Sequence, residues 1–457
     1  VRTVCMNRRA FLTAFAGSPL SFAQPAARKP NIIFILADDL GYGDLGCYGQ
    51  TKTQTPNIDK LASEGIRFTQ AYAGSTVCAP SRCALMTGKH TGHGRIRGNT
   101  RLDLQPEDMT VPKLLKKAGY RTALIGKWGL GTAGHEGAPN KQGFDEFFGY
   151  LDQRHAHSYY PTHLWENDYE FFLPGNFGSK RTQYTHDLFT QRALSFVDAQ
   201  NAAKPFFLYL AYTIPHANNE LTKESGNGME VPGDAPYSGR DWPQQDKNFA
   251  AMVTRLDKDV GRLMDLLKQK GLDQNTLVLF TSDNGPHREG GNRPEFFHSS
   301  GPLKGIKRAL YEGGIRVPAI ARWTGVIQPG RTVDQPWAFW DFLPTAAGLA
   351  GVAAPQGLDG ISIAPVFRGE SIPDRDHFYW EFHERGFAQA VRMGDWKGVR
   401  NPGAALELYN LKTDISEKNN VAAAHPDVVA RLAAIMQHDR TDSPDFPVTR
   451  AARNSAQ

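Results

Sequence analysis

Carboxylate and amide side chains follow two of the short apolar runs in this 457-residue sequence. The first pair is Asp38 and Asp39, and the second pair is Asp283 and Asn284. Hard oxygen donors without histidine or cysteine favour Ca²⁺ or Mg²⁺ over Zn²⁺. An Asp-Asp pair alone is ordinarily a turn or a helix cap. Because a matching Asp-Asn pair follows a second apolar run, we interpret all four residues as ligands of one divalent cation.

A second candidate group is centred on Cys78, which opens the sequence Cys-Ala-Pro-Ser-Arg. Pro80 suits the first turn of a helix, so residue 78 is expected at a helix N-terminus, where free N–H groups and the helix dipole favour an anion. The cysteines of the chain are Cys5, Cys47, Cys78 and Cys83. Without further context, Cys78 could equally be a buried structural thiol or form a disulfide with Cys83.

The elements that would position these residues can be predicted from hydrophobic patterning. Short apolar runs predict buried strands at 32–37, 122–126, 206–212 and 277–280. Amphipathic segments between them predict helices over 56–65, 111–119 and 246–271. Strands that alternate with helices favour an α/β fold with a mostly parallel sheet.

The ends of the predicted strands converge on one place. Lys127 ends the second run and His216 follows the third, while the acidic pairs follow the first and fourth. Ligands bind beyond the carboxyl ends of the strands in such sheets, so we expect a single active site drawn from four distant segments. A lone lysine is usually a solvated surface charge, and a lone histidine is usually structural, so the surrounding motifs must decide their roles.

Those motifs resemble the sulfatase family. The shared segments are Cys-Ala-Pro-Ser-Arg (78–82) with Thr-Gly (87–88), Ala-Asp-Asp-Leu-Gly-Tyr-Gly-Asp-Leu (37–45), Gly-Lys-Trp (126–128), Pro-His (215–216), Ser-Asp-Asn-Gly (282–285) and Tyr-Glu-Gly-Gly-Ile-Arg-Val-Pro (311–318). The resemblance runs from about Asn31 to the last predicted helix and implies an alkaline-phosphatase-like α/β fold. It also implies a sulfuric ester hydrolase whose Cys78 is oxidised to formylglycine by a formylglycine-generating enzyme during maturation.

The resemblance assigns roles to individual residues. A hydrated formylglycine offers one hydroxyl to attack sulfur and a second to expel sulfate. Calcium, with magnesium as the less favoured choice, would bind Asp38, Asp39, Asp283, Asn284 and an oxygen of the modified Cys78. The catalytic cations would be Arg82 at the diol, Lys127 and Lys307 on the sulfate oxygens, with Lys304 as a nearby competitor. His216 would protonate the leaving alcohol.

One departure from the family pattern affects the mechanism. The family usually reads Gly-Lys-Trp-His-Leu-Gly, whereas Gly129 stands in place of that histidine here. We expect the segment 154–163 to fill the role, with His155, His157 and His163 as candidates that could instead bind substrate or merely cover the sheet. His157 is preferred, because in an extended segment His155 and His157 cannot both be replaced by their neighbour on the side that faces the site.

The two ends of the sequence predict further parts. Residues 1–23 resemble an export signal, possibly of the twin-arginine type because of Arg8-Arg9, which predicts a periplasmic or extracellular protein. The catalytic domain is expected over 24–370. After a Gly/Pro-rich seam, short strands and a last helix predict a small α+β domain over 371–457.

Composition excludes some classes and leaves others open. The net charge is +5 without a run of basic residues, so nothing indicates nucleic-acid binding, and no further apolar run is long enough to span a membrane. A sulfated sugar or an aryl sulfate is the expected substrate. The alternatives are a phosphonate or phosphodiester hydrolase that uses the same motif, and a sulfated-glycan-binding relative without catalysis.

Overall fold

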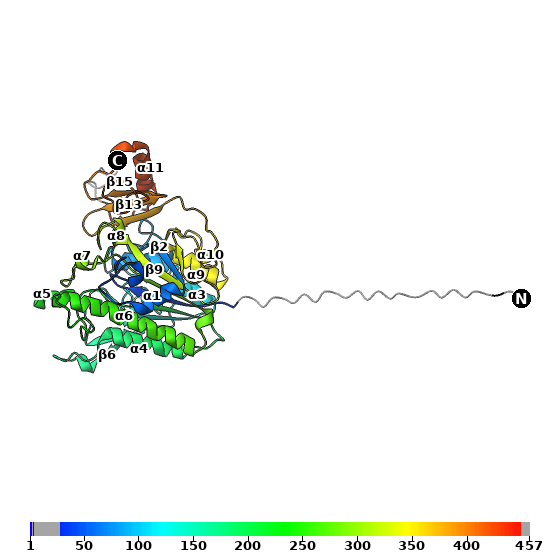
Figure 1. Ribbon diagram of the computed structural model, residues 1–457, viewed down its shortest axis with the longest axis vertical. Helices are drawn as coiled ribbons and strands as arrows, with labels where there is room; N and C mark the ends of the chain where they lie inside the picture. Colours follow the sequence, from blue (N-terminus) through cyan, green and yellow to red (C-terminus); the bar gives the residue numbers. More distant parts are fainter. Residues whose placement is uncertain (2, 4–27, 449–457) are drawn as a thin grey trace.

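A mixed sheet of eleven strands forms the centre of the described part of the chain (Figure 1). The computed structural model describes residues 1, 3 and 28–448, so the predicted export signal lies, except for two positions, outside the described residues. Within the described residues, no helix is long and apolar enough to cross a membrane.

Five neighbouring strands in the middle of the sheet run parallel, as predicted. In spatial order they are β8 (Thr276–Ser282), β1 (Asn31–Ala37), β7 (Phe206–Ala211), β3 (Arg121–Lys127) and β4 (Glu146–Tyr150). Their carboxyl ends therefore meet at one edge, and Ala37 pairs with Ser282 at the last position of β1 and β8. This register places the two predicted ligand pairs side by side.

The flanking strands make the sheet mixed. Beside β8 lie the antiparallel β9 (Arg316–Arg322), then β2 (Ile66–Tyr72), β10 (Arg331–Val333) and β11 (Trp337–Ala338). Beside β4 lies the hairpin of β5 (His163–Glu166) and β6 (Tyr169–Phe172), which pairs antiparallel to it.

Helices cover both faces of the sheet because the central strands are apolar on both sides. Alternate residues of β1 divide between two cores, with Phe34 in one and Ile33 in the other. The first core includes α2 (Cys78–Thr87), α3 (Val111–Lys117) and α9 (Phe342–Ala350). The second includes α1 (Pro56–Ser63), α4 (Thr185–Asp198) and α6 (Gln244–Gln269). The shorter helices are α5 (Asn219–Ser225), α7 (Pro294–Phe297), α8 (Glu312–Ile315) and α10 (Ala364–Phe367).

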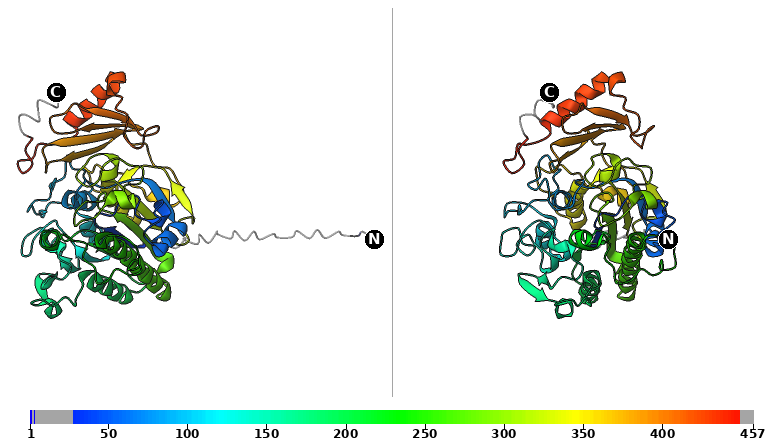
Figure 2. Two further views of the ribbon diagram at one scale, coloured as in Figure 1. Left: turned by 60° about the vertical axis from the view of Figure 1, so that its left-hand side comes forward. Right: turned by 90° about the vertical axis from the view of Figure 1, so that its left-hand side faces the viewer.

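A second, four-stranded antiparallel sheet lies above the first in Figure 2. It comprises β12 (Phe378–Phe382), β13 (Ala388–Met393), β14 (Trp396–Arg400) and β15 (Glu407–Asn410), with α11 (Pro426–His438) packed against β13 and β14. The small C-terminal α+β part of the fold is thus confirmed, while the domain boundary at residue 370 stays a prediction.

Candidate functional site

The predicted ligand pairs lie together at the carboxyl ends of β1 and β8. The backbone N–H of Asp39 donates to Asp283 Oδ1 at 3.1 Å, and Asn284 Nδ2 donates to Asp39 Oδ1 at 2.6 Å. Asp38, Asp39, Asp283 and Asn284 are all buried. Asp39 takes a left-handed backbone conformation with φ of 65°, which turns the chain sharply just after the strand.

This arrangement fits a hard divalent cation. Asn284 Oδ1 is buried and accepts no hydrogen bond from any described residue, so it is an oxygen donor available to an ion. Burial and the neighbouring charges of Asp38 and Asp39 raise the pKa of Asp283, because three carboxylates converge here. A bound cation would relieve that repulsion, and its ligands would be oxygens of these four residues.

Cys78 is the first residue of α2, as its proline spacing predicts. Its Sγ lies 3.3 Å from Asp38 Oδ1, and every residue of α2 is buried. Burial and the negative charge of Asp38 raise the pKa of the Cys78 thiol well above its usual value, so an unmodified thiol would be a poor nucleophile here. Cys78 and Cys83 are both free, so the alternative of a disulfide between them is wrong.

Two buried cations surround the Cys78 side. Arg82 donates through Nε and Nη2 to Asp283 Oδ2 at 3.0 and 2.8 Å, and its Nη1 donates to the carbonyl of Lys127 at 2.8 Å. Lys127 Nζ donates to Asp38 Oδ2 at 2.7 Å. Burial opposes the charged form of Lys127, but the Asp38 carboxylate outweighs it and raises the pKa of this ammonium group.

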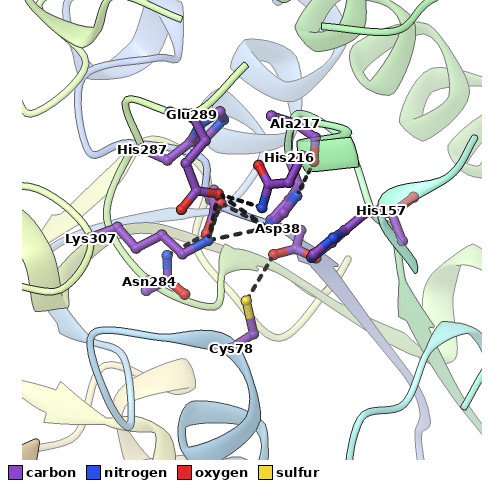
Figure 3. A network of polar contacts seen from close by, with 12 residues as sticks. Asp38, Cys78, His157, His216, Ala217, Asn284, His287, Glu289 and Lys307 are labelled. Atoms are coloured by element: carbon purple, nitrogen blue, oxygen red, sulfur yellow. Dashed lines mark hydrogen bonds and ion pairs between the residues drawn. The ribbon is translucent and has the colours of Figure 1, made fainter. Parts of the chain in front are cut away.

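The opposite side is formed by Lys307 and His216, which Figure 3 shows facing Cys78 across the site. Lys307 Nζ donates to Asp39 Oδ2 at 2.7 Å and to His216 Nε2 at 3.1 Å. His216 Nδ1 lies 2.7 Å from the carbonyl of Ala217, which fixes the proton on Nδ1 and leaves Nε2 as an acceptor. Burial, and then Lys307, lower the pKa of His216 to about 3.

The competing lysine, Lys304, points elsewhere. Its ammonium group lies 3.8 Å from the ring centre of Tyr311 and donates to Tyr409 Oη at 3.1 Å. The spacing of Lys307 four residues before Tyr311 therefore identifies the lysine that reaches the carboxylates.

Sequence reasoning missed two residues of the loop after β8. Glu289 Oε2 lies 3.5 Å from Lys307 Nζ and 3.8 Å from His216 Nε2. His287 Nε2 donates to the carbonyl of Pro215 at 3.1 Å, and its Nδ1 accepts from the N–H of Glu289 at 3.0 Å. His287 thus braces the loop that holds Glu289. Their only sequence signal is that they follow the Asp283-Asn284 motif within six residues.

The three histidines predicted near Gly129 separate in space. His157 stacks on the ring of His216 with centroids 5.1 Å apart, and its Nδ1 lies 2.9 Å from Glu220 Oε2. His155 packs instead against Tyr150 and His163, with centroids 5.0 and 4.6 Å apart. The reasoning from an extended segment is wrong, because residues 155–157 form a 3₁₀ turn.

The space beside Gly129 is filled by a residue that lies just before the expected segment. A Cβ on Gly129 would lie 2.1 Å from Gln153 Nε2, so a side chain at position 129 and the present position of Gln153 exclude each other. Gly129 also has a φ of 79°, which side chains rarely adopt. Glycine at 129 and glutamine at 153 are therefore a matched pair.

Comparisons with known proteins agree with this site. The Sulfatase family model matches residues 30–352, and the model of the N-sulphoglucosamine sulphohydrolase C-terminal region matches residues 306–442. N-acetylgalactosamine-6-sulfatase of Canis lupus familiaris is 35% identical over 402 residues, which cover 82% of this chain and 72% of that protein. Arylsulfatase A of Homo sapiens is 35% identical over 472 residues, which cover 89% and 87%.

A solved structure shares the whole architecture. The crystal structure of Ps i-CgsB in complex with k-i-k-neocarrahexaose matches with a TM-score of 0.79 and 31% identity, over 94% of this chain and 98% of that chain. The chain belongs to the sulfatase family, has its alkaline-phosphatase-like fold and is a sulfuric ester hydrolase.

Proposed function

We propose that the protein removes sulfate from sulfated carbohydrates and that its nucleophile is a formylglycine derived from Cys78. The supporting observation is that Cys78 opens a buried helix beside Asp38, within one cluster that also contains Lys127, Lys307 and His216. The similarity to N-acetylgalactosamine-6-sulfatase and to Ps i-CgsB, which was solved with a carrahexaose, favours a sugar sulfate over an aryl sulfate.

In this proposal Cys78 Sγ stands where an oxygen of the hydrated aldehyde would be. That diol supplies a hydroxyl that attacks sulfur and a second hydroxyl that allows sulfate to leave. Lys127 and Lys307 bind the sulfate oxygens, because both ammonium groups lie on the walls beside Cys78. Arg82 holds Asp283 and the carbonyl of Lys127 in place around the same point.

His216 would hold the proton that the leaving alcohol needs. Its Nε2 already accepts a hydrogen bond from Lys307, so a proton can reach it from that ammonium group. Binding of a sulfate anion beside His216 would also favour the protonated ring, because an opposite charge favours the charged form of a base.

The metal in this proposal is Ca²⁺, with Mg²⁺ as the less favoured choice. Asp38, Asp39, Asp283 and Asn284 supply the flexible all-oxygen ligand set that Ca²⁺ prefers, and an oxygen of modified residue 78 would join it. When bound, the ion would neutralise sulfate charge and lower the pKa of the diol.

His157 is our candidate for the role that the missing histidine leaves at Gly129. It lies against His216, and the ring is oriented by Glu220. Lys127 contributes to lowering the pKa of His157 after burial does, which keeps the ring neutral and able to accept a proton. His155 and His163 would bind substrate or support this segment.

Maturation would require two partners outside the fold. We propose that a formylglycine-generating enzyme acts on the Cys-Ala-Pro-Ser-Arg motif and that residues 1–23 direct export to the periplasm or beyond. The division into a catalytic domain over 24–370 and a C-terminal domain over 371–457 belongs to the same proposal.

The test combines mass spectrometry with sulfate release. Purified active protein should contain a Cys78 peptide with the mass of formylglycine or its hydrate. Cys78→Ala should lose about 10³-fold or more in turnover of a sulfated sugar, because covalent catalysis is removed, while Cys83→Ala should stay close to wild type. Full activity with residue 78 entirely a thiol would refute the mechanism, and faster turnover of a phosphodiester than of any sulfate ester would refute the function.

A further inference from the structure

A large cavity lies next to the reaction centre and has no part in the chemistry described above. Its volume is about 610 Å³, and its walls come from three segments, 152–160, 176–181 and 218–230. Glu220 belongs to this wall and also contacts His157 through its carboxylate, 2.9 Å from Nδ1. One carboxylate thus separates the cavity from the histidines seen in Figure 3.

One arginine of the cavity wall is held in a fixed position. Arg181 forms an ion pair with Glu230, whose side chain is only 3% exposed, and its guanidinium lies 4.6 Å from the ring centre of Tyr160. Glu230 Oε2 in turn accepts hydrogen bonds from Asn218 Nδ2 at 2.7 Å and from the N–H of Tyr159. Because an arginine fork that is already oriented loses little entropy on binding, Arg181 is prepared to receive an anion.

This wall is tied directly to the catalytic histidine. Tyr159 Oη donates to the carbonyl of His216 at 2.5 Å and lies 2.9 Å from the carbonyl of Thr213. Asn218, which holds Glu230, is two residues beyond His216. The cavity wall and the reaction centre therefore share one rigid framework, which fixes the distance between them.

Further cations line the same cavity. Arg154, Lys180 and Arg101 belong to its lining together with Arg181. Arg154 is 80% exposed and reaches Glu220 only at 3.6 Å, so most of its N–H donors remain open to the cavity. Two of the lining carboxylates, Glu220 and Glu230, are already engaged by protein donors, so the groups free to meet a ligand are mainly cationic.

We propose that this cavity is a subsite for a second anionic group of the substrate, a sulfate ester or a carboxylate on the sugar that adjoins the one being desulfated. The volume is in the range of ligand pockets and suits a sugar unit rather than a bare ion. The inference rests on the proposed function, since it assumes a carbohydrate sulfate at Cys78. It makes the substrate a polyanionic oligosaccharide, and Arg154, Lys180 and Arg181 its specificity-determining residues.

The experiment compares three oligosaccharides with the same backbone and the same scissile sulfate. The adjoining sugar carries no charge in the first, a second sulfate in the second and a carboxylate in the third. Wild-type protein should show a higher kcat/KM for a charged oligosaccharide. In Arg154→Gln/Lys180→Gln that preference should fall by about 10-fold or more, as expected for two lost charge contacts, while kcat/KM for the uncharged neighbour changes less than about 2-fold.

Matched variants separate the subsite from general charge effects. Lys204→Gln/Lys412→Gln removes two exposed lysines, one of them at the amino end of β7, and should keep the wild-type preference. Arg181→Gln is made together with Glu230→Gln, so that no buried carboxylate is left unpaired, and should also lose the preference.

The outcomes distinguish the subsite from the function. Equal kcat/KM of wild-type protein for all three oligosaccharides would overturn the subsite and leave the sulfatase proposal intact. An equal loss on all three in the double variant would overturn it as well. Failure of wild-type protein to release sulfate from any of them would instead refute the proposed carbohydrate substrate. A preference for only one of the charged forms identifies the group as sulfate or carboxylate.

Discussion

Two clusters of buried charge in this molecule use the same residue types in opposite ways. The reaction-centre cluster contains Asp38, Asp39 and Asp283 with Arg82, Lys127 and Lys307. The inter-sheet cluster contains Glu312 and Glu417 with Lys397 and Arg316, and it joins α8 to β14 of the second sheet. Both are almost completely buried.

The difference lies in what the carboxylates face. In the inter-sheet cluster each oxygen of Glu312 meets a cation or a hydroxyl, Lys397 Nζ at 2.8 Å on one side and Tyr72 Oη at 2.7 Å on the other. In the reaction-centre cluster three carboxylates converge on one another and on an unpartnered amide oxygen of Asn284. Opposite charges that close on themselves fix a structure, whereas like charges that converge leave a place for a ligand.

Removal of the cation should break the reaction-centre cluster most severely. Asp39→Asn deletes a ligand charge and the partner of Lys307, so we expect loss of bound metal and of nearly all sulfate release. Exhaustive chelation of wild-type protein should reproduce this and lower Tm, because a ligand present at 100 times its Kd contributes about 2.7 kcal/mol to the stability of the folded state. Elemental analysis and calorimetry measure both effects. Full activity without detectable metal would show that the cluster serves another purpose.

The inter-sheet cluster should respond in stability and not in metal content. Lys397→Met leaves Glu312 and Glu417 buried beside each other without their shared cation, which should lower the free energy of unfolding by about 3–5 kcal/mol. Denaturant unfolding checks this, with exposed Lys412→Met as control. Adding Glu312→Gln should recover part of the loss. An equal loss of bound metal would mean that the two clusters are coupled and that the comparison fails.

The contrast also explains what could be predicted from the sequence. The four core strands and the reaction-centre residues were readable, because each ligand stands at the end of an apolar run or inside a short motif. Lys397 and Glu417 carry no such signal, since their partners come from the packing of two sheets. The 3₁₀ turn at His155 and the position of Gln153 against Gly129 were also beyond the sequence, because they depend on how a loop folds back over the sheet.

The histidine beside the reaction centre tests how far the cluster extends. His157→Ala should lower kcat by about 10²-fold, the usual scale for one acid–base group, with little change in KM. His155→Ala is the matched control from the same turn, because its ring packs on Tyr150 and His163 instead of His216. Steady-state kinetics with a sulfated sugar decides the matter. Wild-type kcat with a raised KM in both variants would make the segment a substrate clamp.

A buried carboxylate outside both clusters shows what the cations contribute. Asp44 Oδ2 accepts from the N–H of Gly41 at 2.7 Å, and the groups that lower the pKa of Asp44 are hydrogen-bond donors and not cations. Burial therefore dominates and raises this pKa from its model-peptide value of 3.8 to about 7. At pH 8 the folded protein must hold a buried carboxylate charge without an ion-pair partner.

The sign of the resulting pH dependence follows from linkage. A carboxyl group whose pKa is higher in the folded state binds its proton more tightly there, so its stabilising contribution is complete below about pH 4 and is lost as the pH rises through 7. Asp44→Asn removes this titration. We expect Tm of the variant to exceed that of wild-type protein by about 1–3 °C at pH 8 and to lose the advantage at pH 5. Calorimetry across this range checks the difference. An advantage that is the same at both pH values would mean that the amide acts through packing, and that cations are not what keeps the carboxylates of the two clusters charged.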